Sequence, residues 1–132
     1  MPARCSFDYA VVRVVPRVER EEFMNVGVIL SCRTRQFLDA LIELDESRFR
    51  GFAPWLDPEE VKDYLRPIRA ICAGGADAGP IGLLPQRQRF HWLVAPRSTV
   101  VQMSAVHAGL CDDPVVALER LLDRMVRVPP TA

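Results

Sequence analysis

The sequence contains no long apolar segment, since no run approaches the roughly twenty apolar residues that a membrane-spanning helix needs. Its first ten residues, MPARCSFDYA, include no apolar core of signal-peptide length. Cysteine pairs of the Cys-x-x-Cys type are also missing, because the cysteines are far apart; they are Cys5, Cys32, Cys72 and Cys111. Such spacing is typical of free thiols in a reducing compartment. We therefore expect a cytoplasmic protein that does not enter a membrane.

An excess of charge of either sign is absent. The 17 basic residues balance the 17 acidic ones, so the formal net charge is zero. A neutral chain has no general attraction for nucleic acid, and no nucleic-acid recognition motif is present. Nucleic-acid binding is therefore not expected. A net charge near zero tolerates self-association, which leaves a homo-oligomer open.

Lysine is almost missing, because Lys62 is the one basic residue that is not arginine. Two explanations fit this bias. One is codon usage in a G+C-rich genome, and the other is selection of arginine for planar, bidentate contacts to carboxylate or phosphate. Composition alone does not distinguish them.

Residue patterns that carry catalysis or hold cofactors are also lacking. His91 and His107 are the only histidines, and neither shows the spacing of a nucleophile with its base. The histidines and scattered cysteines form no close pair of zinc ligands. The glycine-rich segment 74–82 lacks a following Gly-Lys-Ser/Thr and a preceding strand, so it is a flexible linker and not a phosphate loop. We expect no cofactor and no metal, and we favour a non-catalytic protein.

Apolar patterning predicts three consecutive strands, over 7–15, 25–32 and 37–44. The first is apolar on both faces, which indicates an interior strand covered on both sides. In the second, Gly27 would let a neighbour approach closely. The connector 34–36 is short enough for a hairpin to the third.

Helix-capping residues and the spacing of apolar residues predict two helices. One begins after Asp57 and ends at 74–75; its expected apolar stripe is Val61, Tyr64, Leu65, Ile68 and Cys72. The other covers 114–128 after Asp113, with the expected stripe Val115, Leu118, Leu122 and Met125. The pattern of residues 86–95 does not distinguish a helix from other structure, and residues 98–107 predict a fourth strand.

Together these elements predict a single α+β domain over 1–132, with its core at about 7–127. We expect a mainly antiparallel sheet of about four strands with helices packed on one face.

Arg13 is the first candidate site residue, because it lies among valines in a predicted interior strand. A charge in that position must be paired or must reach solvent. Glu19 or Glu22 would supply a partner. Alternatively, the long side chain would extend to the edge of the sheet.

The connector after this strand concentrates charge in Arg17, Glu19, Arg20 and Glu22. These residues would form a partner- or anion-binding edge, or else a solvated turn with weak surface ion pairs. Asn25 follows them at the start of the second strand. We expect its side chain to close the turn through a bond to the backbone, in preference to binding a ligand.

Arg97, Ser98 and Thr99 precede the predicted fourth strand. A guanidinium and two hydroxyls suit a phosphate or a carboxylate. The hydroxyls would serve equally well to cap a turn.

Two segments carry a resemblance to a known family: YAVVRVVPRVEREEFMNVGVIL and FHWLVAPRSTVVQMSAVHAGLCDDP. Over about residues 7 to 127 the chain resembles the bacterial family called domain of unknown function 3037 (DUF3037), most specifically in N-V-G-V-I-L and A-P-R-S-T-V-V-Q. The family has no established activity to carry over. Its members are often encoded beside a HipA-like kinase-fold protein, so the resemblance implies a protein partner.

These observations predict a non-catalytic interaction or regulatory module, in which the connector and the segment 97–99 recognise a partner protein. The alternative is an anion- or nucleotide-binding protein, or a small enzyme. That alternative requires Arg13, Arg97 and His107 to converge in one concave pocket around an anionic ligand.

Overall fold

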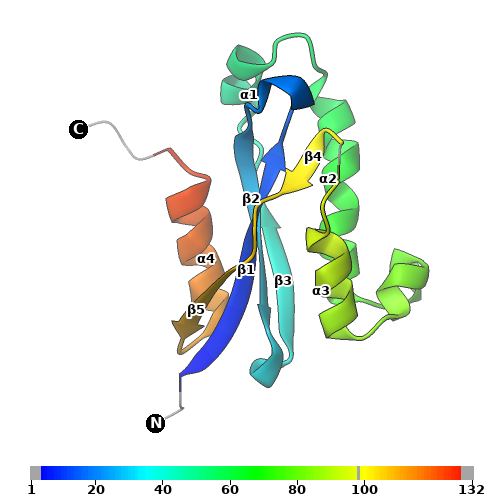
Figure 1. The fold of residues 1–132 in the computed structure, drawn as a ribbon, viewed down its shortest axis with the longest axis vertical. Helices are drawn as coiled ribbons and strands as arrows, with labels where there is room; N and C mark the ends of the chain where they lie inside the picture. Colours follow the sequence, from blue (N-terminus) through cyan, green and yellow to red (C-terminus); the bar gives the residue numbers. More distant parts are fainter. Residues whose placement is uncertain (1–3, 98, 129–132) are drawn as a thin grey trace.

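In the computed structural model, which describes residues 4–97 and 99–128, helices enclose an antiparallel sheet (Figure 1). The strands of these residues are β1 (Cys5–Val14), β2 (Met24–Cys32), β3 (Phe37–Ile42), β4 (Val101–Met103) and β5 (His107–Cys111). The helices are α1 (Glu46–Phe52), α2 (Pro58–Ala73), α3 (Gln86–Val94) and α4 (Pro114–Met125). Short 3₁₀ turns are η1 (Val18–Arg20), η2 (Arg33–Arg35), η3 (Ala76–Ala78) and η4 (Pro80–Leu83).

β1 is the central strand of the sheet. β2 pairs with one side of it, and β3 pairs with the outer side of β2. The other side of β1 is shared, because β4 pairs with residues Val12–Val14 and β5 with residues Cys5–Tyr9. The predicted interior position of this strand is therefore confirmed.

Hydrophobic cores lie on both faces of the sheet. Val12 and Val14 point into the core beneath α2 and α3, whereas Phe7, Val28 and Leu30 point into the core beneath α4. Figure 1 shows α4 on one side of the sheet and α2 with α3 on the other. The α+β class and the antiparallel sheet are confirmed. The structure differs in covering both faces, because β1 and β2 bear apolar side chains on both sides and neither face tolerates water.

The predicted strand 98–107 is two short strands, β4 and β5, with a break at Ser104. Here the Ser104 hydroxyl accepts the Val11 N–H at 2.8 Å and donates to Ala105 O at 2.8 Å. The Ser104 N–H donates to Val11 O at 2.9 Å. The serine thus satisfies both backbone groups of Val11 while the chain turns from one strand to the next.

The helix starts are confirmed, but α1 was not predicted and the buried stripes differ. Asp57 accepts the Glu59 N–H at 3.0 Å, and Asp113 accepts the Val115 N–H at 2.9 Å. Tyr64 is 53 % exposed, contrary to expectation. Val115 and Met125 are also exposed, and the stripes include Ile71 and Leu121 in their place.

The glycine-rich segment 74–82 folds back on itself through η3 and η4, and Gly75 N donates to Gly82 O at 2.8 Å. Arg89 of α3 then fastens the end of α2. Its guanidinium donates to Ile71 O and to Leu84 O, each at 2.9 Å. Arg89 also donates to Cys72 O. The Ile71 and Cys72 carbonyls are among the last of α2, which the helix itself leaves without partners.

Candidate functional site

A β-bulge places the predicted site residues Arg13 and Asn25 opposite each other. Gly27 of β2 faces Val12 of β1, but Asn25 faces Arg13, so Val26 has no opposite residue. Bulges of this kind re-aim side chains at the ends of sheets. Since Val12 and its alternate neighbour point toward α2, Arg13 lies on the face toward α4.

The Arg13 guanidinium stacks on an aromatic ring and does not form the expected ion pair. Its Cζ lies 3.9 Å from the centroid of the Phe23 ring, which is a cation–π contact. Within residues 4–97 and 99–128, Nε of Arg13 is buried without a hydrogen-bond partner. Neither Glu19 nor Glu22 forms an ion pair with Arg13; the Glu22 carboxylate pairs with Arg20 instead.

Asn25 fastens the end of α4 and does not close its own turn. Its Nδ2 donates to Met125 O at 2.9 Å, and Arg48 of α1 donates to Val126 O at 3.3 Å. Both side chains satisfy carbonyls at a helix C-terminus, where the helix dipole also favours the Arg48 cation. The Oδ1 atom of Asn25 is buried and has no partner in the described part of the chain.

Arg17 repeats the arginine–aromatic arrangement. Its Cζ lies 4.7 Å from the centroid of the Trp55 ring, which comes from the connection between α1 and α2. The Trp55 side chain is 56 % exposed and Phe23 is 46 % exposed. Exposed apolar side chains indicate a binding surface when they form a contiguous patch rimmed by polar groups.

The two stacked pairs belong to one continuous surface. A hollow of about 330 Å³ beside Phe23 is lined also by Phe52, and Phe52 borders the smaller hollow beneath Arg17 and Trp55. Figure 1 shows α1 and the turn η1 at the same end of the sheet. We call Arg13, Arg17, Phe23, Phe52 and Trp55 the sheet-end surface.

The remaining residues of the connector contribute less. Arg20 and Glu22 pair with each other on the surface, and Glu19 is exposed. Ion pairs at this exposure contribute little to stability. Among the predicted connector residues, Arg17 is the one that contacts an aromatic ring.

The segment after α3 is occupied by contacts of its own. Arg97 lies 4.2 Å from the centroid of the Trp92 ring and donates to Trp92 O at 2.6 Å. Thr99 donates to Val101 O at 2.7 Å, which is the turn-capping role. Ser98, the other predicted hydroxyl, lies outside the described residues.

His107 lies opposite a different part of β1 from Arg13, whose neighbour across the strands is Gln102. His107 is the exposed first residue of β5, opposite Tyr9, and the two rings lie 5.4 Å apart. Arg97 follows α3 on the α2 side of the sheet, whereas Arg13 faces α4. The predicted convergence of Arg13, Arg97 and His107 in one pocket is therefore wrong.

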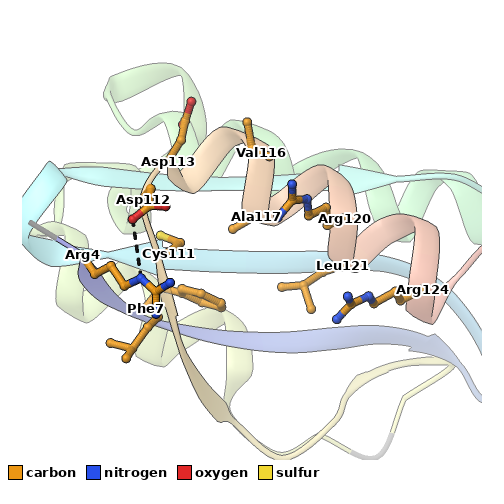
Figure 2. Close-up of a pocket in the computed structure, with 11 residues that line it drawn as sticks. Arg4, Phe7, Cys111, Asp112, Asp113, Val116, Ala117, Arg120, Leu121 and Arg124 are labelled. Atoms are coloured by element: carbon orange, nitrogen blue, oxygen red, sulfur yellow. Dashed lines mark ion pairs between the residues drawn. The ribbon is translucent and has the colours of Figure 1, made fainter. Parts of the chain in front are cut away.

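A second concave site lies along α4 and escaped the sequence analysis (Figure 2). This groove has a volume of about 480 Å³ and is bordered by β1, β5 and α4. Its charged groups are three arginines and two aspartates: Arg4, Arg120, Arg124, Asp112 and Asp113. Arg4 lies 3.7 Å from Asp112, but within the described residues Arg120 and Arg124 form no ion pair. Figure 2 shows these two side chains along the same stretch of the helix.

Part of this groove was visible in the sequence. Arg120 and Arg124 are four residues apart, which places them on one face of the predicted last helix. Arg4 and Cys111 join them only through the pairing of β1 with β5, which joins opposite ends of the chain. No local pattern indicates that pairing.

Two features are absent from residues 4–97 and 99–128. These residues contain no group of three or more His, Cys, Asp or Glu side chains placed to hold a metal ion. None of the helices that they form is long and apolar enough to cross a membrane.

Comparison with known proteins identifies a family and nothing more specific. Neither the curated proteins nor the solved structures include a match to the chain. The family model described as "Protein of unknown function (DUF3037)" matches residues 9–126, which is nearly the whole chain. Both segments quoted in the sequence analysis lie within this span. The chain therefore belongs to the DUF3037 family.

Proposed function

We propose that this protein is a non-catalytic interaction module whose sheet-end surface binds a partner protein through a segment that carries carboxylates. The observation that supports it is the pair of arginine–aromatic contacts in which the rings are half exposed, Arg13 on Phe23 and Arg17 on Trp55. Arginine and aromatic side chains are enriched at the centres of protein interfaces.

Stacking prepares these arginines to bind. A guanidinium that lies flat on a ring keeps its N–H groups at the edge of the plane, where they can form bidentate bonds to a carboxylate. Within the described residues, no carboxylate forms an ion pair with the guanidinium of Arg13 or Arg17. The charge of the surface is therefore complementary to an acidic segment.

The family context indicates which partner to assay first. DUF3037 members resemble this chain, and the resemblance implies a HipA-like kinase-fold protein encoded nearby. The proposal places the module in the bacterial cytoplasm, which is supported by four free, buried cysteines. A second copy of the chain is a competing occupant, and its binding would appear as a concentration-dependent dimer.

The test begins with a tagged full-length chain purified from the native host, followed by mass spectrometry of stoichiometric partners. Affinity is then measured with the purified partner for Arg13→Gln and Arg17→Gln. We expect each variant to weaken binding by more than about tenfold. Arg66→Gln is the matched control, because Arg66 is an exposed arginine of α2 that pairs with Asp63.

The proposal fails if no stoichiometric partner co-purifies. It also fails if both folded variants keep the affinity of the control. Arg13→Lys refines the test, because lysine keeps the charge but loses the flat stack and the bidentate geometry. Binding by Arg13→Lys equal to that of the original protein would contradict the stacking argument.

A second candidate function is binding of a small anion in the groove along α4. It is favoured by Arg120 and Arg124, which line this concave site and form no ion pair within the described residues. Nucleotides and inorganic phosphate are the probes, and thermal stabilisation is the readout. Stabilisation that Arg120→Gln and Arg124→Gln abolish would support it, and unchanged melting with every probe would contradict it.

A further inference from the structure

Two thiols that are far apart in the sequence lie next to each other on adjacent strands of the sheet. Cys5 of β1 and Cys111 of β5 are direct partners in the antiparallel register. Their Sγ atoms lie 3.5 Å apart, and Cys5 Sγ also lies 3.4 Å from Cys111 O. The thiols are thus held in contact by the backbone pairing of the strands.

This pairing meets the geometric condition for a disulfide. Opposite residues of an antiparallel pair have Cα atoms about 4.5–5.5 Å apart, within the range of about 4.4–6.8 Å that disulfides span. The sulfur atoms must close to about 2.05 Å, which requires side-chain rotation and a local adjustment of the strands. Disulfides formed under such constraint are easily reduced.

The groove along α4 gives a reactant access to this pair. Both thiols are mostly buried, but Cys111 lines the groove together with Arg4, Arg120 and Arg124 (Figure 2). Arg4 lies against Asp112, and Asp113 also lines the groove. A reactant that carries carboxylates would therefore be attracted mainly by Arg120 and Arg124.

We propose that Cys5 and Cys111 form a redox-active dithiol, which an anionic low-molecular-weight disulfide enters the groove to oxidise to a cross-strand disulfide. This site is independent of the sheet-end surface. Transient, reversible disulfides are the kind found in reducing compartments.

The reaction is an exchange of two thiols for one disulfide. The Cys111 thiolate attacks one sulfur of the small disulfide, which forms a mixed disulfide and expels one thiolate. Cys5 then loses its proton to solvent and attacks Sγ of Cys111, which expels the second thiolate. Each expelled thiolate takes up a proton, so two protein thiols are oxidised and one small disulfide is reduced to two thiols.

Two other cysteines define the specificity of the proposal. Cys32 lies close enough to Cys5 for a hydrogen bond. Burial raises the pKa of Cys32, but hydrogen bonds with Thr34 and Cys5 and the nearby charge of Arg35 lower the pKa overall. Its side chain is fully buried, away from the groove lining. Cys72 belongs to the core on the other face of the sheet and is the matched control.

Burial and the neighbouring Cys5 raise the pKa of the Cys111 thiol to about 12, so its thiolate is scarce at neutral pH. The first experiment therefore treats the full-length protein with glutathione disulfide at alkaline pH and follows the reaction over time. Alkylation, intact mass and peptide mapping then locate the oxidised residues. We expect two of the four thiols to disappear as a Cys5–Cys111 linkage, and dithiothreitol to restore them. Four surviving thiols, or a linkage of Cys5 to Cys32, would overturn the proposal.

Variants separate the two steps of the exchange. Cys5→Ser should stop the reaction at Cys111 with one glutathione attached, and Cys72→Ser should react as the original protein does. If Cys5→Ser does not fold, Cys5→Ala is used in its place. If neither variant folds, the peptide mapping of the unmutated protein still decides whether Cys5 and Cys111 become linked. A Cys5→Ser protein that accumulates no mixed disulfide would contradict the attack by Cys111.

The role of the groove is tested by changing the charge of either reactant. Arg120→Gln with Arg124→Gln should slow oxidation by glutathione disulfide by about tenfold or more. The same double variant should react normally with 2-hydroxyethyl disulfide, which is uncharged. Equal rates of the variant and the original protein with glutathione disulfide would overturn the assignment of the groove.

Discussion

Gly27 lies so close to Ile42 that a Cβ atom on Gly27 would come within 2.6 Å of Ile42 Cδ1. The same atom would be 2.7 Å from Leu41 O, a backbone group that is fixed by the pairing of β2 with β3. Gly27→Ala must therefore displace β3. We expect the free energy of unfolding to fall by about 1–3 kcal/mol, as overpacking typically costs, and urea denaturation measures it.

Gly51 provides the matched control. It lies in α1, and a Cβ atom there would meet nothing within 4 Å. Alanine is favoured over glycine in a helix by about 0.5–1 kcal/mol, so Gly51→Ala should stabilise the protein. Equal effects of the two substitutions would show that the close approach of β3 to Gly27 is not real.

Ser104 is expected to matter for stability although it is a small polar residue. Ser104→Ala removes the oxygen that accepts the buried Val11 N–H. A buried donor left without a partner costs about 1–3 kcal/mol, and thermal and urea denaturation would detect that loss. Ser6→Ala is the comparison, because Ser6 is exposed on β1 and such surface changes usually stay within about 0.5 kcal/mol.

Asn25 should control the order of the last turn of α4. Asn25→Ala removes the bond to Met125 O, so amide exchange at the end of α4 should accelerate while the rest of the sheet is unchanged. Gln102→Ala is the control, since Gln102 also donates from its amide to a backbone carbonyl, that of Thr99. Acceleration at α4 in the Gln102 variant, or none in the Asn25 variant, would contradict this role.

The features of the fold that were predictable are those that neighbouring residues determine. Asp57 and Asp113 begin α2 and α4 because each accepts an N–H two residues ahead. The central place of β1 follows from its apolar residues on both faces. The same observation implied helices on both faces of the sheet, which the predicted one-sided arrangement did not use. The break at Ser104 depends on Val11, 93 residues away, and no local pattern indicates it.

The candidate site shows the same division. Arg13 was found because a charge among valines is conspicuous, but its aromatic partner Phe23 depends on the bulge opposite Val12. Cys5 and Cys111 are separated by 106 residues, and they meet only because β5 returns to the start of β1. Contacts of this kind require the strand order, which residue periodicity does not contain.

Glu43 and Arg127 give the protein a stability that depends on pH. Arg127 donates to both oxygens of Glu43, at 2.9 and 3.2 Å, and so joins the end of β3 to the chain after α4. This hydrogen-bonded pair, with its charge attraction, lowers the pKa of Glu43 below its usual value. A lowered pKa in the folded state means that the unfolded chain binds the proton more readily.

The contribution of the pair is therefore fully present above the usual glutamate pKa of about 4.3 and is lost as pH falls through the lower folded value. The unfolding free energies of Glu43→Gln, Arg127→Gln and the double variant measure it as a coupling. We expect a small favourable coupling at neutral pH, because both side chains are about half exposed and water screens them. The coupling should shrink in high salt and vanish in acid. A coupling that persists when Glu43 is protonated would mean that packing of the side chains, and not their charge, joins β3 to the end of α4.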